Sequence, residues 1–178
     1  MVERDGDWLA LEPLLHFVIP FAGLLLLGLD VKRALLIGLL GLAPDLDALF
    51  HVHRSWSHSV LAYLPLLLVS WFFLRGFWVE AVLGYFVLVS HCLMDLFAGY
   101  TPVLWPLSTR SYWLSVGLEG NLNPGIRVWP VFEVLSKPVD FTYFESITYS
   151  LFTGEGLVVS LILLAPVIIK VLGWRVPQ

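Results

Sequence analysis

The sequence has few charged residues, a single cysteine and no dense basic patch. Charged side chains make up 13% of its 178 residues, against about 25% in soluble domains. So little charge cannot cover a globule in water, which predicts an integral membrane protein. The lone Cys92 excludes an intrachain disulfide, and the missing basic patch argues against nucleic acid as a partner. The acidic N-terminus lacks the basic region of a cleaved signal peptide.

Long apolar runs are what the sequence has instead of charge, and hydrophobic residues make up 58% of it. A helix needs about 20 apolar residues to cross a bilayer core. We therefore predict an all-α, polytopic membrane helix bundle of about five spans, with residues 1–178 forming one integral membrane domain in contact with the lipid bilayer. The expected spans lie at about residues 14–29, 34–50, 60–74, 77–97 and 156–172.

The segment at about residues 99–154 has a different character, because it is rich in proline and tryptophan. The Asn123-Pro124-Gly125 run is a turn signal, and tryptophans such as Trp105 and Trp129 favour the headgroup level of a membrane. We expect this segment to lie on the membrane surface, where short interfacial helices would fit.

Lysine and arginine near the ends of the runs indicate an orientation. In a five-span topology Lys32, Arg33, Arg75, Lys170 and Arg175 fall on one side, which we assign to the cytoplasm. We accordingly expect a multi-pass protein of the inner (cytoplasmic) membrane whose opposite, extracytoplasmic face carries most of the remaining ionisable residues.

Ionisable residues within and beside the apolar runs gather at ends that would face the same side of the membrane. Such groups are costly near hydrocarbon and mark a functional site by default. All five histidines of the chain belong to this group. Its members are His16, Asp45, Asp47, His51, His53, Arg54, His58, His91 and Asp95.

Local spacing gives two pairs within this group a specific interpretation. His91 and Asp95 are four residues apart and share one helix face, so they can bind one cation, or Asp95 can orient the imidazole; a buried hydrogen bond that holds helices together is the alternative. Asp45 and Asp47 follow Pro44, which disrupts a helix and lets both carboxylates turn into one site. For them the alternative is a hydrophilic helix end.

The remaining members have weaker patterns. Arg54 and His58 are four residues apart, and a guanidinium suits phosphate or carboxylate groups, although Arg54 would also serve as a headgroup anchor. His51 and His53 fit solvated loop residues as well as ligands. His16 stands alone in an apolar run, where a histidine packs between helices or binds a metal.

Imidazoles and carboxylates from four separate elements suit zinc, manganese or iron, as one or two ions. The motifs that carry these residues also resemble a known family. They are His16 in the first run, GLAPDLD at 41–47, HRSWSHS at 53–59, HCLMD at 91–95 and LWPL at 104–107. Over about residues 14–108 the sequence resembles the YdjM-like family of membrane-bound metal-dependent hydrolases, described as LexA-regulated inner-membrane proteins.

The resemblance implies a metal-dependent hydrolase, with zinc as the leading metal. The ligands that it implies are His16, Asp45, Asp47, His58, His91 and Asp95, with His53 as a further candidate.

We predict hydrolysis of an ester, in the first place a phosphoester of a lipidic or amphiphilic small molecule, at one membrane face. A bound metal lowers the pKa of water and polarises the scissile group. Asp45 or Asp47 would take the proton of the water, and Arg54 would hold the anionic group.

Two other functions stay open at this point. A metal-free lipid phosphatase would use a histidine nucleophile backed by an aspartate, and His91 and Asp95 have a suitable spacing. However, the chain lacks a cradle of lysines and arginines for phosphate. A non-catalytic metal or proton carrier, or a structural membrane protein, is the third function, although the runs at 60–74 and 156–172 carry few polar residues for a path through the membrane.

Overall fold

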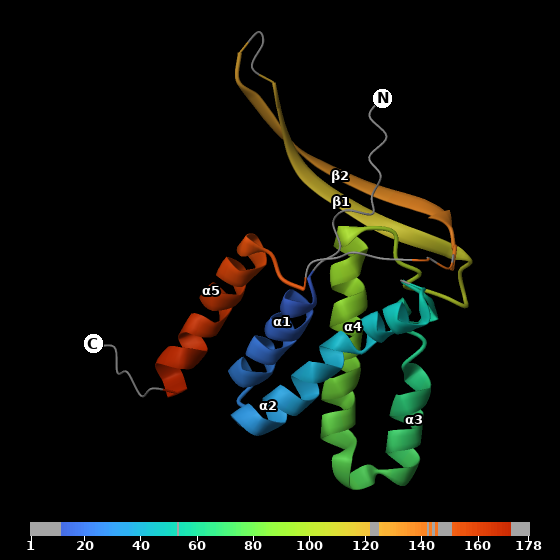
Figure 1. Cartoon of the computed structure of the whole chain (residues 1–178), viewed down its shortest axis with the longest axis vertical. Helices are drawn as coiled ribbons and strands as arrows, with labels where there is room; N and C mark the ends of the chain where they lie inside the picture. The colour runs from blue at the N-terminus through green and yellow to red at the C-terminus, as the bar shows by residue number, and fades with distance from the viewer. Residues whose placement is uncertain are drawn as a thin grey trace.

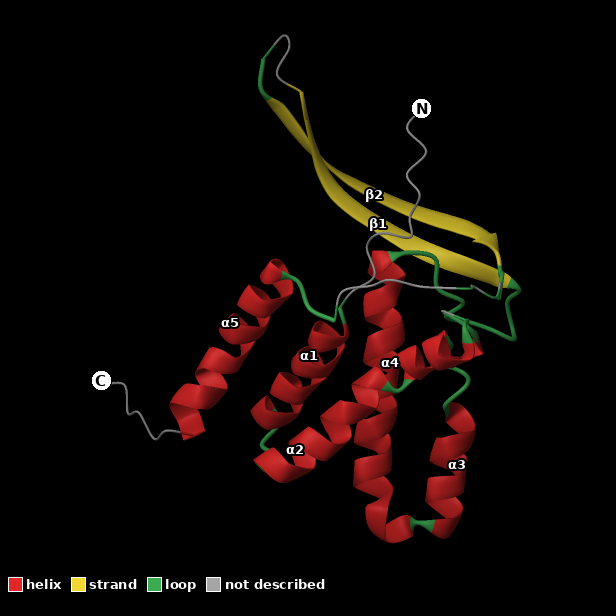
Figure 2. Cartoon of the chain, viewed as in Figure 1, coloured by secondary structure: helices red, strands yellow, loops and turns green. Residues whose placement is uncertain are grey.

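The computed structural model describes residues 12–52, 54–121, 125–141, 143, 145 and 151–171. Five helices lie side by side below a two-stranded β-ribbon that crosses the C-terminal end of the longest helix (Figures 1 and 2). The helices are α1 (Pro13–Leu26), α2 (Val31–Gly38), α3 (Leu64–Phe73), α4 (Trp78–Ala98) and α5 (Gly154–Val171), and the strands are β1 (Arg110–Asn121) and β2 (Arg127–Pro138).

The prediction of an all-α bundle of about five spans is wrong. Among the described residues, one helix is long and apolar enough to cross a membrane, the 24 residues Arg75–Ala98 that contain α4. The first expected span yields the 14-residue helix α1, which covers only about 21 Å at 1.5 Å per residue. The third yields the 10-residue helix α3. A multi-pass topology is therefore not supported, and the orientation remains a prediction.

The second expected span is broken into short pieces. After α2 ends at Gly38, the chain continues as 3₁₀ turns, η2 (Leu39–Leu42) and η3 (Pro44–Phe50), and η4 (Trp56–His58) follows. Pro44 at the start of η3 cannot donate a backbone hydrogen bond, which explains why no regular helix continues through the run. Pro44 marked this break in the sequence, although the run at 34–50 was still counted as one expected span.

Gly41 allows η2 to lie directly against α1. A Cβ atom at this position would collide with the carbonyl oxygen of His16, so only glycine permits so close an approach of the two backbones. The contact brings the 3₁₀ turns beside α1, and η2 and η3 also contact α4. One apolar cluster packs Val87 of α4 against residues of α1 and α2, and a second contains Cys92 and Leu96 nearer the C-terminal end of α4.

Within the segment at 99–154, residues 110–121 and 127–138 form an antiparallel β-ribbon, where short interfacial helices were expected. Its register runs from Arg110 opposite Pro138 to Asn121 opposite Arg127. Residues at alternate positions share a face, and the pairs Val116–Phe132 and Leu118–Pro130 lie on one exposed apolar face. This two-residue alternation was the signal that the tryptophan content masked. The turn predicted at Asn123-Pro124-Gly125 stays a prediction, because residues 122–124 lie outside the described part.

The base of the ribbon is attached to the end of α4. Tyr112 and Leu114 pack against the cluster around Cys92 and Leu96, and the indole Nε1 of Trp113 donates a hydrogen bond to the carbonyl oxygen of Phe97, 3.2 Å away. The ribbon therefore covers the same end of α4 at which the polar residues of the helix are found.

Candidate metal centre

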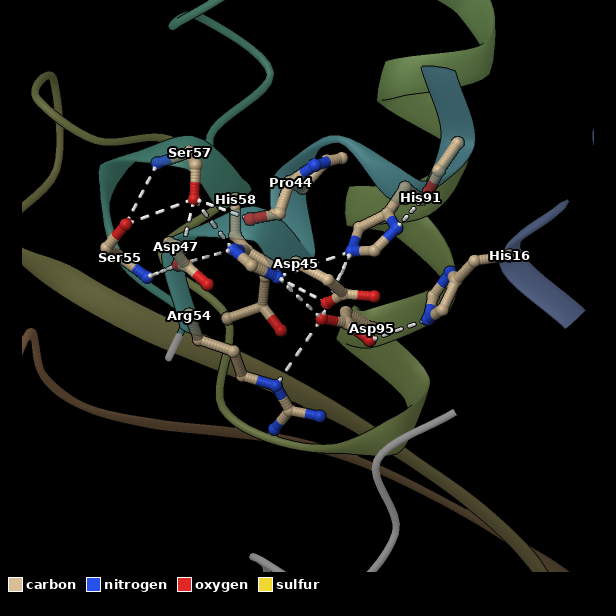
Figure 3. A network of polar contacts seen from close by, with 12 residues as sticks. His16, Pro44, Asp45, Asp47, Arg54, Ser55, Ser57, His58, His91 and Asp95 are labelled. Carbon is tan, nitrogen blue, oxygen red and sulfur yellow. Dashed lines mark hydrogen bonds and ion pairs between the residues drawn. The ribbon is translucent and has the colours of Figure 1, made fainter. Parts of the chain in front are cut away.

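Four side chains from three elements present nitrogen and oxygen atoms to a common point (Figure 3). Asp45 comes from η3, His58 from η4, and His91 and Asp95 from α4. One ligand-type atom from each of the four lies within 4.8 Å of the others, so these residues could hold a metal ion. The three residues other than Asp45 are buried, and the side chain of Asp45 is 18% exposed.

The atoms alternate between imidazole nitrogens and carboxylate oxygens. His58 Nε2 lies 3.2 Å from Asp95 Oδ2 and 3.5 Å from Asp45 Oδ1. His91 Nε2 lies 3.4 Å from Asp45 Oδ1, and 3.7 Å from Asp95 Oδ2. Among the described residues, Asp95 Oδ2 is a buried oxygen without a hydrogen bond. Two imidazoles and two carboxylates form a donor set that suits zinc, manganese or iron.

The outer nitrogen of each histidine is held in place. His91 Nδ1 lies 2.7 Å from the carbonyl oxygen of Gly41. Because a carbonyl oxygen only accepts, Nδ1 carries the proton and the neutral ring turns the lone pair of Nε2 toward the cluster. His58 Nδ1 lies 3.3 Å from Asp47 Oδ2. Metal-binding histidines characteristically donate their other N–H to a carbonyl or a carboxylate, so the arrangement fits a metal ion.

Asp47 lies behind His58 and is not among the four residues that converge. Its Oδ2 accepts a hydrogen bond from the backbone N–H of Ser55 at 2.8 Å and lies 2.9 Å from the hydroxyl of Ser57. Both serines belong to the HRSWSHS motif at 53–59, but no role was expected for them from the sequence. Their alternation with Arg54, Trp56 and His58 was the only signal that they would face Asp47.

His16 lies on the opposite side of the cluster, on α1. Its ring stacks on that of His91 with centroids 3.8 Å apart, and its Nε2 lies 3.3 Å from Asp95 Oδ1. His16 thus contacts two members of the cluster without being one of the four. Arg54 approaches from the loop before η4, where its Nε lies 3.5 Å from Asp95 Oδ2 and its side chain is 11% exposed.

Two histidines of the sequence-based group do not take part in this cluster. The ring of His51 stacks on Tyr143 with centroids 5.0 Å apart. His53 lies outside the described residues, so its candidacy stays a prediction.

The electrostatics of the cluster favour a positive charge at its centre. Burial alone would raise the pKa of Asp45, but the neighbouring imidazoles of His58 and His91 outweigh it and hold the pKa well below its ordinary value. Burial would likewise lower the pKa of His58, yet the carboxylates of Asp45, Asp47 and Asp95 raise it well above 6.5. Without a metal ion, a proton on His58 therefore supplies the positive charge that the carboxylates attract.

Two histidines and two aspartates, three of the four buried, lie close to the end of a helix with the length and composition of a membrane span, and together they form a candidate metal centre. The particular family follows from comparison with known proteins. The family model described as YdjM inner membrane protein matches residues 12–172, and the chain belongs to this family. The resemblance inferred from the motifs is thereby confirmed. Searches of curated proteins and of solved structures gave no match.

Proposed function

We propose that this protein is a metal-dependent hydrolase that cleaves a phosphoester of an amphiphilic molecule at one face of the inner membrane. The observation that carries the proposal is the convergence of His58 and His91 with two carboxylates, with the outer nitrogen of each ring held by Asp47 or by the Gly41 carbonyl. A purely structural polar core would not need both Nε2 atoms to face the same point.

In this proposal Asp45, His58, His91 and Asp95 hold the metal. A divalent ion bound there would polarise the ester and lower the pKa of the attacking water. Asp47 and the Gly41 carbonyl orient the two imidazoles, and His16 positions Asp95 through the 3.3 Å contact between its Nε2 and Oδ1. The sequence-based assignment of Asp47 and His16 as ligands thus becomes a positioning role.

Asp45 is the residue best placed to accept a proton from water. Its side chain is 18% exposed, whereas those of His58 and His91 are fully buried, so water and substrate approach the cluster from its side. The lowered pKa of Asp45 keeps its carboxylate ionised, and an ionised carboxylate accepts hydrogen bonds only. The partly exposed carboxylate of Asp45 would take the proton of the attacking water.

Arg54 is the residue best placed to bind the negative charge of the substrate. Its side chain is partly exposed beside Asp95, and among the described residues its buried Nε makes no hydrogen bond. A guanidinium has a planar fork of donors that matches phosphate oxygens. A phosphoester is therefore favoured over a neutral ester.

The position of the cluster favours an amphiphilic substrate. Asp95 lies three residues before Ala98, where the candidate membrane span ends. A site at the end of a span lies near the depth of lipid headgroups, where an amphiphile presents its polar group.

The test uses the purified full-length protein. Elemental analysis should find a divalent metal at stoichiometric levels, and hydrolysis of octyl phosphate should stop with EDTA and return when the metal is restored. Glu80→Gln, which lies on α4 away from the cluster, serves as a control and should behave as the wild type. A protein that retains no metal and cleaves the ester regardless would refute the proposal.

One observation supports a second route. The contact of His58 Nδ1 with Asp47 is the arrangement of a histidine nucleophile backed by an aspartate, with Nε2 directed to the cluster. From their spacing, His91 and Asp95 were the expected pair for this role, but the outer nitrogen of His91 faces the Gly41 carbonyl. Activity that survives EDTA and leaves phosphate on His58 would favour this metal-free phosphatase.

A further inference from the structure

A cavity of about 540 Å³ lies beside the candidate metal centre. Most of its lining is hydrocarbon or aromatic, from Leu46, Phe50, Val52, Trp56 and Phe141. Pockets that hold small organic ligands measure about 300–1,000 Å³ and are lined mainly by apolar side chains. The cavity therefore has the size and the surface of a ligand site, and the metal centre does not use it.

The cavity and the metal centre share one wall. Asp47, Ser55 and Ser57 line the cavity, and Asp47 contacts the outer nitrogen of His58 on the other side. Within this wall Asp47 Oδ2 accepts a hydrogen bond from Ser55 N–H at 2.8 Å and one from Ser57 Oγ at 2.9 Å. The remaining lining is apolar, so the cavity presents mainly apolar surface to a ligand.

The mouth of the cavity is also apolar. Leu46, Phe50 and Trp56 are 55%, 76% and 56% exposed, respectively. Large apolar side chains grouped at an opening mark a surface that contacts lipid or a ligand. In a protein of an inner membrane family, a hydrocarbon chain can reach such an opening without passing through water.

We propose that this cavity binds the hydrocarbon chain of a single-chain amphiphile while its phosphoester headgroup lies at the metal centre. The proposal deepens the proposed function and rests on it for the headgroup chemistry. The chain-binding part rests on separate observations, namely the size of the cavity, its apolar lining and the wall that it shares with the centre. The substrate class is therefore an alkyl or acyl-chain phosphoester, not a small water-soluble phosphate.

The first experiment measures kcat/KM for ethyl, butyl, hexyl and octyl phosphate, all as monomers. Each methylene that the cavity buries can raise kcat/KM by up to about fourfold, so kcat/KM should rise steeply with chain length. Leu46→Trp fills the cavity and should remove most of this dependence. Leu66→Trp, which adds the same side chain at an exposed position of α3, is the matched control and should keep it.

A second variant guards against a folding defect in Leu46→Trp. Phe50→Ala removes a lining side chain that is mostly exposed, and it should lower the octyl-to-ethyl ratio of kcat/KM several-fold while metal content is unchanged. Equal chain-length dependence in the wild type, Leu46→Trp and Phe50→Ala would overturn the proposal.

A binding experiment separates this proposal from the hydrolase itself. Dansyl-undecanoic acid carries a hydrocarbon chain without a phosphoester, and the rise in its directly excited dansyl fluorescence reports its binding to protein in an amphipathic polymer. We expect saturable binding in the wild type and Leu66→Trp and its loss in Leu46→Trp. If no alkyl phosphate is cleaved but this binding pattern holds, only the hydrolase proposal fails. If cleavage occurs but Leu46→Trp binds the probe normally, only the cavity proposal fails.

Discussion

The Nε2 atoms of His58 and His91 lie 3.3 Å apart, although 33 residues separate the two histidines in the sequence. Two neutral imidazoles with their protons on Nδ1 would turn their lone pairs toward each other, which is unfavourable without a positive charge between them. Asp45 and Asp95 add negative charge at the same point. The folded protein thus builds a place for a cation before any ion is bound.

Loss of one ligand should lower the metal content of the protein. We expect His58→Ala and Asp95→Ala each to bind less than a stoichiometric amount after dialysis, because each removes one of four converging donors. Elemental analysis of the purified variants, beside Glu80→Gln, measures this. Stoichiometric metal in both alanine variants would contradict the ligand assignment.

Asp47→Asn should lower the affinity of the centre for its metal without abolishing metal binding. The carboxylate of Asp47 contacts His58 Nδ1 at 3.3 Å, and loss of such an outer partner typically costs about 10- to 100-fold in metal affinity or activity. Titration with a competing chelator gives the affinity, and Glu133→Gln on the exposed ribbon is the charge-matched control. An affinity equal to that of the wild type would show that Asp47 does not position His58.

Metal binding should release protons at neutral pH. In the metal-free protein the pKa of His58 is raised well above 6.5, so the ring is charged at pH 7 and must lose its proton to bind a metal through Nε2. Affinity should therefore rise with pH until that pKa is passed. Calorimetric titrations in buffers of different ionisation enthalpy count the protons released, and pH-independent affinity between pH 6 and 8 would be the contrary result.

The raised pKa of His58 also makes the stability of the metal-free protein depend on pH. A histidine whose pKa is raised on folding stabilises the folded state fully below the unfolded pKa of about 6.5. This contribution is lost as pH rises through the higher folded pKa. The thermal unfolding midpoint of the metal-free wild type should fall over that range, and that of His58→Ala should fall less.

Gly41→Ala should damage both the fold and the centre. The new Cβ would collide with the His16 carbonyl oxygen. If η2 moved away to relieve the collision, the Gly41 carbonyl oxygen would lose its contact with His91 Nδ1. Overpacking of this kind costs about 1–3 kcal/mol. Thermal unfolding and metal content measure the two effects, and Gly76→Ala is the control because nothing lies within 4 Å of its Cβ position. Wild-type behaviour in both measurements would show that α1 and η2 are not in contact.

Arg54→Gln should affect substrate binding more than metal binding. Because Arg54 contacts only one member of the cluster, through Asp95 at 3.5 Å, the metal should stay while KM for an alkyl phosphate rises. A neutral acetyl ester of the same chain length provides the comparison, since its KM should not change. Equal effects on both substrates would mean that Arg54 does not recognise the phosphate charge.

Sequence patterns anticipated some elements better than others. The run at 77–97 corresponds to α4 almost residue for residue, because it is long, mainly apolar and contains no proline that would interrupt a helix. The run at 34–50 had the same apolar character but breaks after Gly38 and at Pro44. Hydropathy averages over such breaks, and it also averages over the two-residue alternation of β1 and β2, so the ribbon was not foreseen.

The sequence by itself determined the membrane character, the family and the small group of ionisable residues from which a site could be built. These follow from composition and short motifs, which need no knowledge of distant contacts. Only the tertiary structure decided that Asp45, His58, His91 and Asp95 converge while Asp47 and His16 lie behind them. That division depends on angstrom-scale contacts, such as Gly41 against His16, between segments that sequence spacing cannot place relative to one another.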